Sequence, residues 1–215
     1  MGGERVMATL ELLTTWTPYL LVGLGWNIVI SVLAALLGTV LGGVFVLMKL
    51  SRLKLLRVFG VAVPSIVRGA PTLFLLFYLA VLIPNEVVMF GGEIAFAIPL
   101  WLKASLALTA SPFAFTAWNL HAALEFWTAG NKQSALLFIP NWMNGFLITL
   151  LASSGASLVG VSELVGRTNT VINVTGESNA ILLYSYAAIW FLAVALILTF
   201  LVGRLRRYLA STVVL

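Results

Sequence analysis

The chain has 215 residues, of which 61% are hydrophobic and only 9% are charged. Soluble globular domains carry about 25% charged residues, so this composition excludes a soluble domain and predicts a membrane protein. The net charge of +5 does not indicate nucleic-acid binding, because the basic residues gather at the ends of apolar runs. With no cysteine and a single histidine, the chain has no disulfide and no thiolate or histidine metal site, so we expect no metal and no cofactor.

Five apolar runs are each long enough to cross a hydrocarbon core of about 30 Å as a helix. In chain order they cover residues 20–50, 58–83, 94–118, 142–161 and 181–202. The second run is interrupted at residues 68–71, and the third contains Pro99 and Pro112. We expect an all-α membrane protein with about five transmembrane helices. Residues 1–17 are predicted to form a periplasmic amphipathic lead-in, and residues 18–210 a single transmembrane domain.

The charges then predict an orientation. If the N-terminus is outside, the basic residues on the cytoplasmic side are Lys49, Arg52, Lys54, Arg57, Lys132, Arg204, Arg206 and Arg207. Those on the outer side are Arg5, Lys103 and Arg167, and Arg68 lies within a span. Eight basic residues against three, under the positive-inside rule, predict an N-out and C-in topology.

Small residues in the first run form the pattern Gly38-x-x-x-Gly42. Such a pattern allows two helix backbones to approach closely within lipid, where van der Waals packing drives association. It predicts helix packing, although glycine is also simply common in membrane helices. The pattern does not indicate the partner helix.

Arg68 is the one charge deep in an apolar run. A central arginine costs about 2.5–3.5 kcal/mol on insertion scales, so it should face protein, water or the interface. Alternatively, the span starts later and the side chain reaches the cytoplasmic surface. Pro71 favours a helix start or a kink here, because proline removes a backbone donor.

The fourth run is the most polar and contains four residues that we expect to line a solute path. They are Asn144, Ser153, Ser154 and Ser157. Close packing of this helix against another is the alternative, because hydroxyls between helices are common there. His121 and Glu125, in a polar stretch after the third run, are expected to be solvated loop residues rather than an acid–base pair. The spans contain no carboxylate, which argues against an ion-coupled carrier and an intramembrane enzyme.

Several segments of the chain share the pattern of one transporter family. They are residues 25–31 followed by Gly38 and Gly42, residues 66–77 with Arg68-Gly69-Ala70-Pro71, residues 144–151, residues 157–164, and residues 205–209. These segments resemble the permease subunits of bacterial ABC importers for polar amino acids. The resemblance implies the type I ABC importer permease fold, with a gate or helix break at Arg68, Gly69 and Pro71.

The resemblance also implies a function. The chain would be a permease subunit of an ATP-driven importer for amino acids or similar small polar solutes in a bacterial inner membrane. It would not be an enzyme, because ATP hydrolysis belongs to separate subunits. Its partners would be a second permease subunit, two ATP-binding cassette subunits and a periplasmic binding protein that docks on external segments 85–98 and 163–180.

Two departures from the family pattern stand out. Ala152-Ser153 replaces a Lys-Asp pair of the family. The loop that docks onto the ATPase lacks its usual glutamate, whether His121-Ala122-Ala123 or residues 133–135 are aligned with it. The candidate docking residues are His121, Ala122, Ala123, Glu125 and Lys132.

The degenerate docking loop suggests a heteromeric pair in which the partner permease carries the intact loop. A permease-like scaffold or regulatory subunit that conducts no substrate is an alternative. An unrelated small helical carrier or channel is a further one.

Overall fold

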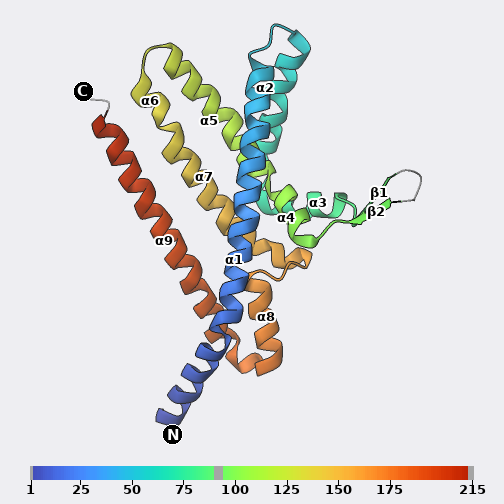
Figure 1. Cartoon of the computed structure of the whole chain (residues 1–215), viewed down its shortest axis with the longest axis vertical. Coiled ribbons are helices and arrows are strands. Elements are labelled where there is room, and N and C mark those ends of the chain that lie inside the picture. The colour runs from blue at the N-terminus through green and yellow to red at the C-terminus, as the bar shows by residue number, and fades with distance from the viewer. Residues whose placement is uncertain (1, 90–93, 213–215) are drawn as a thin grey trace.

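The computed structural model describes residues 2–89 and 94–212. Its longest helices, drawn in Figure 1, are α1 (Gly2–Lys49) and α9 (Ala180–Thr212). At about 1.5 Å per residue, the 48 residues of α1 extend about 72 Å, more than twice the thickness of a hydrocarbon core. Residues 2–17 are the first turns of α1, continuous with the rest of the helix. The domain boundary at residue 17 therefore stays a prediction.

Helix α2 (Lys54–Gly69) folds back along α1. The two backbones touch at Gly60, where a Cβ atom would lie 2.5 Å from the amide nitrogen of Lys49. Helix α3 (Thr72–Leu82) then turns by 109° from α2. Pro71 explains the turn, because proline pushes the preceding Ala70 out of the helical region, and Ala70 has φ −88° and ψ 137°.

A short hairpin follows α3. Strands β1 (Glu86–Met89) and β2 (Ile94–Ala97) are antiparallel, with Glu86 opposite Ala97. The hairpin is a local departure from the all-α architecture expected from the sequence. β-Branched and aromatic residues such as Val87 and Phe96 favour a strand over a helix in a segment this short.

The third apolar run, 94–118, does not form one helix as predicted. After β2 it continues as α4 (Leu100–Leu108) and α5 (Ala110–Thr128). Pro99 is the residue before the first turn of α4. Pro112 has no N–H to donate to the carbonyl of Leu108, where α4 ends. Two prolines therefore divide an apolar run that hydropathy alone treats as continuous.

The second half of the chain contains the remaining elements. They are α6 (Lys132–Leu136), α7 (Phe138–Ala152), the 3-10 helix η2 (Ser153–Val159), α8 (Leu164–Thr175), the 3-10 helix η3 (Glu177–Asn179) and α9. The segment 163–180, expected to be an external loop, is thus mostly helical. Leu164, Val171 and Ile172 of α8 are buried, because α8 packs against α1 and α9.

Two buried apolar clusters hold these elements together. The first joins α1, α3, α4, η2 and the turn after η2, and consists of Ile30, Ala34, Leu76, Ala80, Ala104, Ala107, Leu108, Ala156 and Val161. The second joins α1, α8 and α9, and consists of Leu20, Leu24, Leu164, Val171, Ile172, Leu183 and Ala187. Helix α1 belongs to both clusters and is the central element of the fold (Figure 1).

In the described residues, three helical segments are long and apolar enough to cross a membrane: Val6–Lys49, Lys132–Val159 and Glu177–Leu209. The bent pair α2–α3 would be a fourth if it counts as one span. Large apolar side chains stay exposed on these elements, for example Val81 at 80% and Ile181 at 84%. The prediction of a helical membrane protein is confirmed, whereas the number of five spans stays a prediction.

The fold brings three chain segments to one end of the molecule. Figure 1 shows the α1–α2 turn, the α5–α6 turn and the C-terminal end of α9 at the same end, opposite the N-terminus and α8. These segments carry the eight basic residues that the sequence assigns to the cytoplasmic side. The clustering supports a common side for them, and the N-out and C-in orientation stays a prediction.

Candidate functional site

The four polar residues predicted to line a path do not surround one cavity. Asn144 is exposed on α7, whereas Ser153 is fully buried. Ser154 lines a cavity of about 500 Å³ between η2, α8 and α9, and Ser157 is half-buried. The three serines donate hydrogen bonds to carbonyl oxygens three residues earlier, at 2.6, 2.8 and 3.1 Å. Their hydroxyls satisfy local backbone groups at the change from α to 3-10 helix, and their path role stays a prediction.

Ser153 belongs instead to a buried polar cluster that we call the Asn27 clamp, formed by Asn27, Ser153 and Glu163. All three residues are fully buried. The Asn27 amide nitrogen donates to Ser153 Oγ and to Glu163 Oε2, both at 2.9 Å. Its amide oxygen accepts from the backbone N–H of Leu164 at 3.0 Å. The clamp therefore fastens α1 to η2 and to the first turn of α8.

Glu163 also caps α8. Its carboxylate accepts from the backbone N–H groups of Val165 and Gly166, both at 3.0 Å. Burial raises the pKa of the Glu163 carboxyl, although hydrogen bonds from Val165, Asn27 and Gly166 favour its charged form. Glu163 begins the segment 163–180 that the sequence predicted to be external, and its roles as cap and clamp residue were not predicted. The sequence feature that could have indicated a buried polar cluster was Asn27, the single amide in the first apolar run.

Arg167 adds a second tie between α8 and α1. Its Nε donates to the carbonyl oxygen of Ser162 at 3.1 Å, and its Nη1 donates to that of Tyr19 at 3.2 Å. The guanidinium carbon also lies 4.4 Å from the centre of the Tyr19 ring. The backbones meet closely here, since a Cβ on Gly23 would lie 2.8 Å from Leu164 Cα. This residue, predicted to be external, is thus part of a structural joint.

A cavity lined by several polar side chains lies at the break between α2 and α3, against α5. We call it the break cavity; it has a volume of about 310 Å³. It is lined by Val67, Arg68, Ala70, Thr72, Leu75, Ser111, Ala114, Phe115, Trp118 and Asn119. A volume near 300 Å³ is at the lower end of the range for small-molecule sites. The cavity is therefore large enough for a small solute.

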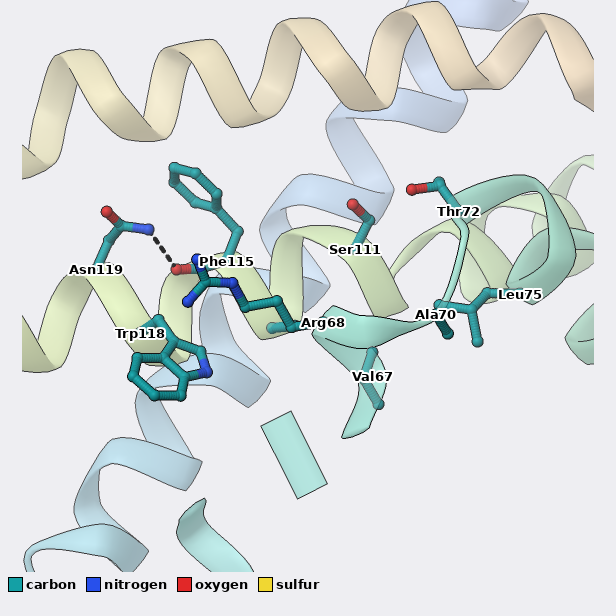
Figure 2. Close-up of a pocket in the computed structure, with 10 residues that line it drawn as sticks. Val67, Arg68, Ala70, Thr72, Leu75, Ser111, Phe115, Trp118 and Asn119 are labelled. Carbon is teal, nitrogen blue, oxygen red and sulfur yellow. Dashed lines mark hydrogen bonds between the residues drawn. The ribbon is translucent and has the colours of Figure 1, made fainter. Parts of the chain in front are cut away.

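Arg68 enters this cavity from the last turn of α2. Figure 2 shows its side chain extending toward Trp118 and Asn119 of α5. The guanidinium carbon lies 5.1 Å from the centre of the Trp118 ring, and Lys49 Nζ lies 5.4 Å from the same ring. Arg68 is thus at a helix end beside a cavity, and not in the middle of a straight span. Gly69 is the last residue of α2, and Pro71 directly precedes α3.

The candidate docking residues form a helical tip rather than a loop. His121, Ala122, Ala123 and Glu125 lie in α5, and Lys132 starts α6. Between the two helices, Gly130 has a φ of +80°, and Asn131 Oδ1 accepts from the backbone N–H of Ser134. The expectation that His121 and Glu125 are loop residues is wrong, because the helix continues through them to Thr128.

Helical spacing also brings two of these residues together. His121 and Glu125 are four apart, and His121 Nε2 lies 3.2 Å from Glu125 Oε1. Glu125 is exposed, so the pair lies at the surface of the tip. Lys132 Nζ lies 5.7 Å from the centre of the Trp127 ring. Within the described residues, no three His, Cys, Asp or Glu side chains lie close enough together to hold a metal ion.

Comparison with known proteins finds similarity to amino acid ABC transporters. No family model matches it. The probable amino-acid ABC transporter permease protein YckA of Bacillus subtilis (strain 168) is 28% identical over 160 residues, which are 69% of this chain and 71% of that protein. A crystal structure of an amino acid ABC transporter with histidines has a TM-score of 0.75, covering 91% of this chain and 96% of that chain at 20% identity. The predicted resemblance to permease subunits of amino-acid ABC transporters is therefore confirmed, and the chain has the fold of these permeases.

Proposed function

We propose that this chain is a transmembrane permease subunit of an ATP-driven importer for amino acids or similar small polar solutes. One observation supports this most strongly: the fold agrees with that of an amino acid ABC transporter over 91% of the chain. The similarity to a probable amino-acid permease points the same way at the level of sequence. ATP binding and hydrolysis belong to separate subunits, so this chain supplies the path and no hydrolytic chemistry.

Two features of the fold support a moving path. The α2–α3 pair breaks with a bend of 109°, and the break cavity lies beside it. Transporters commonly place solute sites at discontinuous helices, where backbone groups at the helix ends face a cavity. We propose that the break cavity is one solute-binding site along the path, and that Arg68, Gly69 and Pro71 form the gate.

The end that carries the basic residues is the proposed cytoplasmic end. There the tip formed by α5 and α6, with His121, Glu125 and Lys132, contacts the ATPase subunits. The opposite end, with α8, receives solute from a periplasmic binding protein. In this proposal the chain lies in a bacterial inner membrane and pairs with a second permease subunit over two ATP-binding cassette subunits.

The missing docking glutamate supports a heteromeric pair, because neither His121 nor Gln133, the two residues that can be aligned with that position, is a glutamate. A partner permease with an intact docking segment would bind the ATPase more tightly than this chain does. The same observation is the basis of the scaffold alternative, in which this chain conducts no solute.

Reconstitution into liposomes tests the function. The chain, its partner permease, the ATPase and the binding protein should together accumulate labelled amino acid only when ATP is supplied. Omission of the partner permease should abolish accumulation if the pair is heteromeric. Amino acid movement through this chain alone, without ATPase, would overturn the importer assignment and favour a carrier or channel.

A second experiment distinguishes a subunit that conducts solute from a scaffold that does not. A cysteine introduced at Ser111 in the break cavity should react with a thiol reagent, and the modification should block uptake. The chain has no native cysteine, so the label is specific. Modification without any effect on uptake would favour the scaffold reading.

A further inference from the structure

The break cavity carries a positive charge that no acidic residue within segments 2–89 and 94–212 balances. Arg68 is exposed at its edge, and Lys49 lies close by, since both approach the ring of Trp118. None of the residues that line the cavity is acidic. In the described part of the chain, neither Arg68 nor Lys49 forms an ion pair with a carboxylate. The electrostatic environment of the cavity therefore favours an anionic group.

Arg68 has the geometry that suits a carboxylate. A guanidinium is planar and presents parallel N–H donors that match the two oxygens of a carboxylate. The Trp118 ring, 5.1 Å from the guanidinium carbon, restricts the orientation of this group. A preorganised guanidinium loses less side-chain entropy when a ligand binds.

The other lining groups suit the remainder of an amino acid. Thr72 and Ser111 contribute hydroxyls, which both donate and accept hydrogen bonds. Asn119 donates its Nδ2 to the carbonyl of Phe115 at 2.9 Å, so its Oδ1 is the atom suited to accept from an ammonium group. Leu75 and Phe115 supply apolar wall.

The helix break adds backbone groups with partial charges of both signs: N–H groups from α3 and carbonyl groups from α2. The first turn of α3 begins at Thr72 with N–H groups that have no partner within the helix. The last turn of α2, which ends at Gly69, contains carbonyl groups that have no partner within the helix. Such ends favour a carboxylate and an ammonium, respectively.

We propose that the break cavity binds an amino acid without a cationic side chain, with its α-carboxylate on Arg68. This proposal rests on the proposed importer function and narrows its substrate class. A neutral or acidic amino acid meets complementary groups in the cavity. An arginine or lysine side chain would instead be repelled by Arg68 and Lys49, with no carboxylate in the lining to receive it.

Equilibrium binding to the permease–ATPase complex tests the proposal without selection by the binding protein. The complex, including the partner permease, is placed in lipid nanodiscs, and labelled glutamine, glutamate and arginine are titrated. We expect glutamine or glutamate to bind at least about tenfold more tightly than arginine. Arginine binding as tightly as either would overturn the proposal, and this arm needs no substitution.

Substitutions then assign the site. Arg68→Gln should weaken glutamine or glutamate binding by about tenfold or more, and Arg68→Lys should weaken it less, because the charge stays while the paired donors are lost. Arg57→Gln, an equal change of charge on the same helix but outside the cavity lining, should change binding by less than about twofold. Unchanged binding in both Arg68 variants would overturn the proposal.

Further controls separate other outcomes. Size-exclusion chromatography checks that each variant still assembles into the permease–ATPase complex. If Arg68→Gln does not assemble, the proposal is tested by the Arg68→Lys variant and by the selectivity of the wild type. Nanodiscs with and without phosphatidylglycerol test whether an anionic lipid headgroup occupies the cavity instead. If phosphatidylglycerol abolishes amino acid binding to the wild type but not to the Arg68 variants, the cavity binds lipid and the proposal is overturned. ATP-driven uptake that does not depend on Arg68 would leave the importer function intact, whereas the absence of any ATP-driven amino acid uptake would refute that function itself.

Discussion

Single polar residues in this protein act mainly as ties between helices. In the Asn27 clamp, one amide satisfies a serine hydroxyl, a carboxylate and a backbone N–H from a segment more than 120 residues away. A buried polar group without a partner is costly, and loss of Asn27 would remove one hydrogen bond from each of these three groups. Asn27 thus helps to hold η2 and α8 against α1, together with Arg167 and the two buried apolar clusters.

Replacement of this residue gives a first prediction. Asn27→Ala should lower the free energy of unfolding by about 1–3 kcal/mol, because Glu163 and the N–H of Leu164 lose a buried partner. Unfolding is followed by helical circular dichroism in mixed detergent micelles titrated with SDS. Asn173→Ala, an exposed change on α8, should alter this free energy by less than about 0.5 kcal/mol. Equal effects of the two variants would show that the clamp does not stabilise the fold.

At the scale of elements, close backbone contact decides which helices pack together. Gly38 and Gly42 of α1 face α5, where a Cβ on either residue would lie 2.7 Å from Phe113 N or Thr116 Cβ. By contrast, Gly25 and Gly43 of α1 have open space around the corresponding position. The sequence pattern did not indicate the partner helix, and the structure identifies it as α5.

This difference between glycines gives a matched pair of variants. Gly38→Ala should destabilise the protein by about 1–3 kcal/mol, since the backbone of Phe113 has no room to move aside. Gly43→Ala should be neutral or stabilise by up to about 1 kcal/mol, because alanine is the better helix former. Both are measured by the same SDS titration. Similar destabilisation in both variants would mean that helix propensity or lipid contact, and not the α1–α5 contact, dominates.

At the scale of the whole molecule, the arrangement of the ends predicts a topology. The α5–α6 turn and the C-terminal end of α9 lie together, and α8 lies at the opposite end (Figure 1). With the basic residues at the first end, that end should be cytoplasmic. The long exposed apolar surfaces of α1, α3 and α9 are then available for lipid and for a partner permease.

Cysteine labelling tests this topology, since the chain has no native cysteine. Single cysteines at Gln133 in α6 and Ser211 in α9 should react with a membrane-impermeant maleimide only after spheroplasts are permeabilised. A cysteine at Thr170 in α8, which is exposed, should react in intact spheroplasts. The reverse pattern would contradict the predicted orientation, and labelling of all three sites in intact cells would contradict a bilayer between the two ends.

Much of the architecture was predictable from composition and from local chemistry. Lipid is the solvent for a chain with 61% hydrophobic residues, and apolar runs alone located α1, α7 and α9. Pro71 predicted the break between α2 and α3, because proline acts on its own backbone and on the residue before it. The third run was misread, since hydropathy does not register the division that Pro99 and Pro112 impose.

The site was less predictable than the fold. The serines of the fourth run were selected because they are polar, and the structure shows that Ser153 and Ser154 donate their hydroxyls to carbonyl groups of the same helical segment. Their role in a path stays a prediction. Trp118 and Ser111 gave no signal, because an indole or a hydroxyl in an apolar run becomes informative only when Arg68 is placed beside it. The role of Glu163 was not predicted, because a single amide such as Asn27 in an apolar run indicates a polar partner but not which residue it is.

The sequence by itself determined that this protein lies in a membrane, that a helix breaks near Pro71 and which family the chain resembles. These properties follow from residue composition and from short-range backbone chemistry. Only the tertiary structure decided that α5 is the partner of Gly38 and Gly42, that Asn27 holds Glu163, and that Arg68 lies at a cavity with Trp118. Those pairings join residues far apart in the chain, and they depend on how helices with similar apolar surfaces pack around α1.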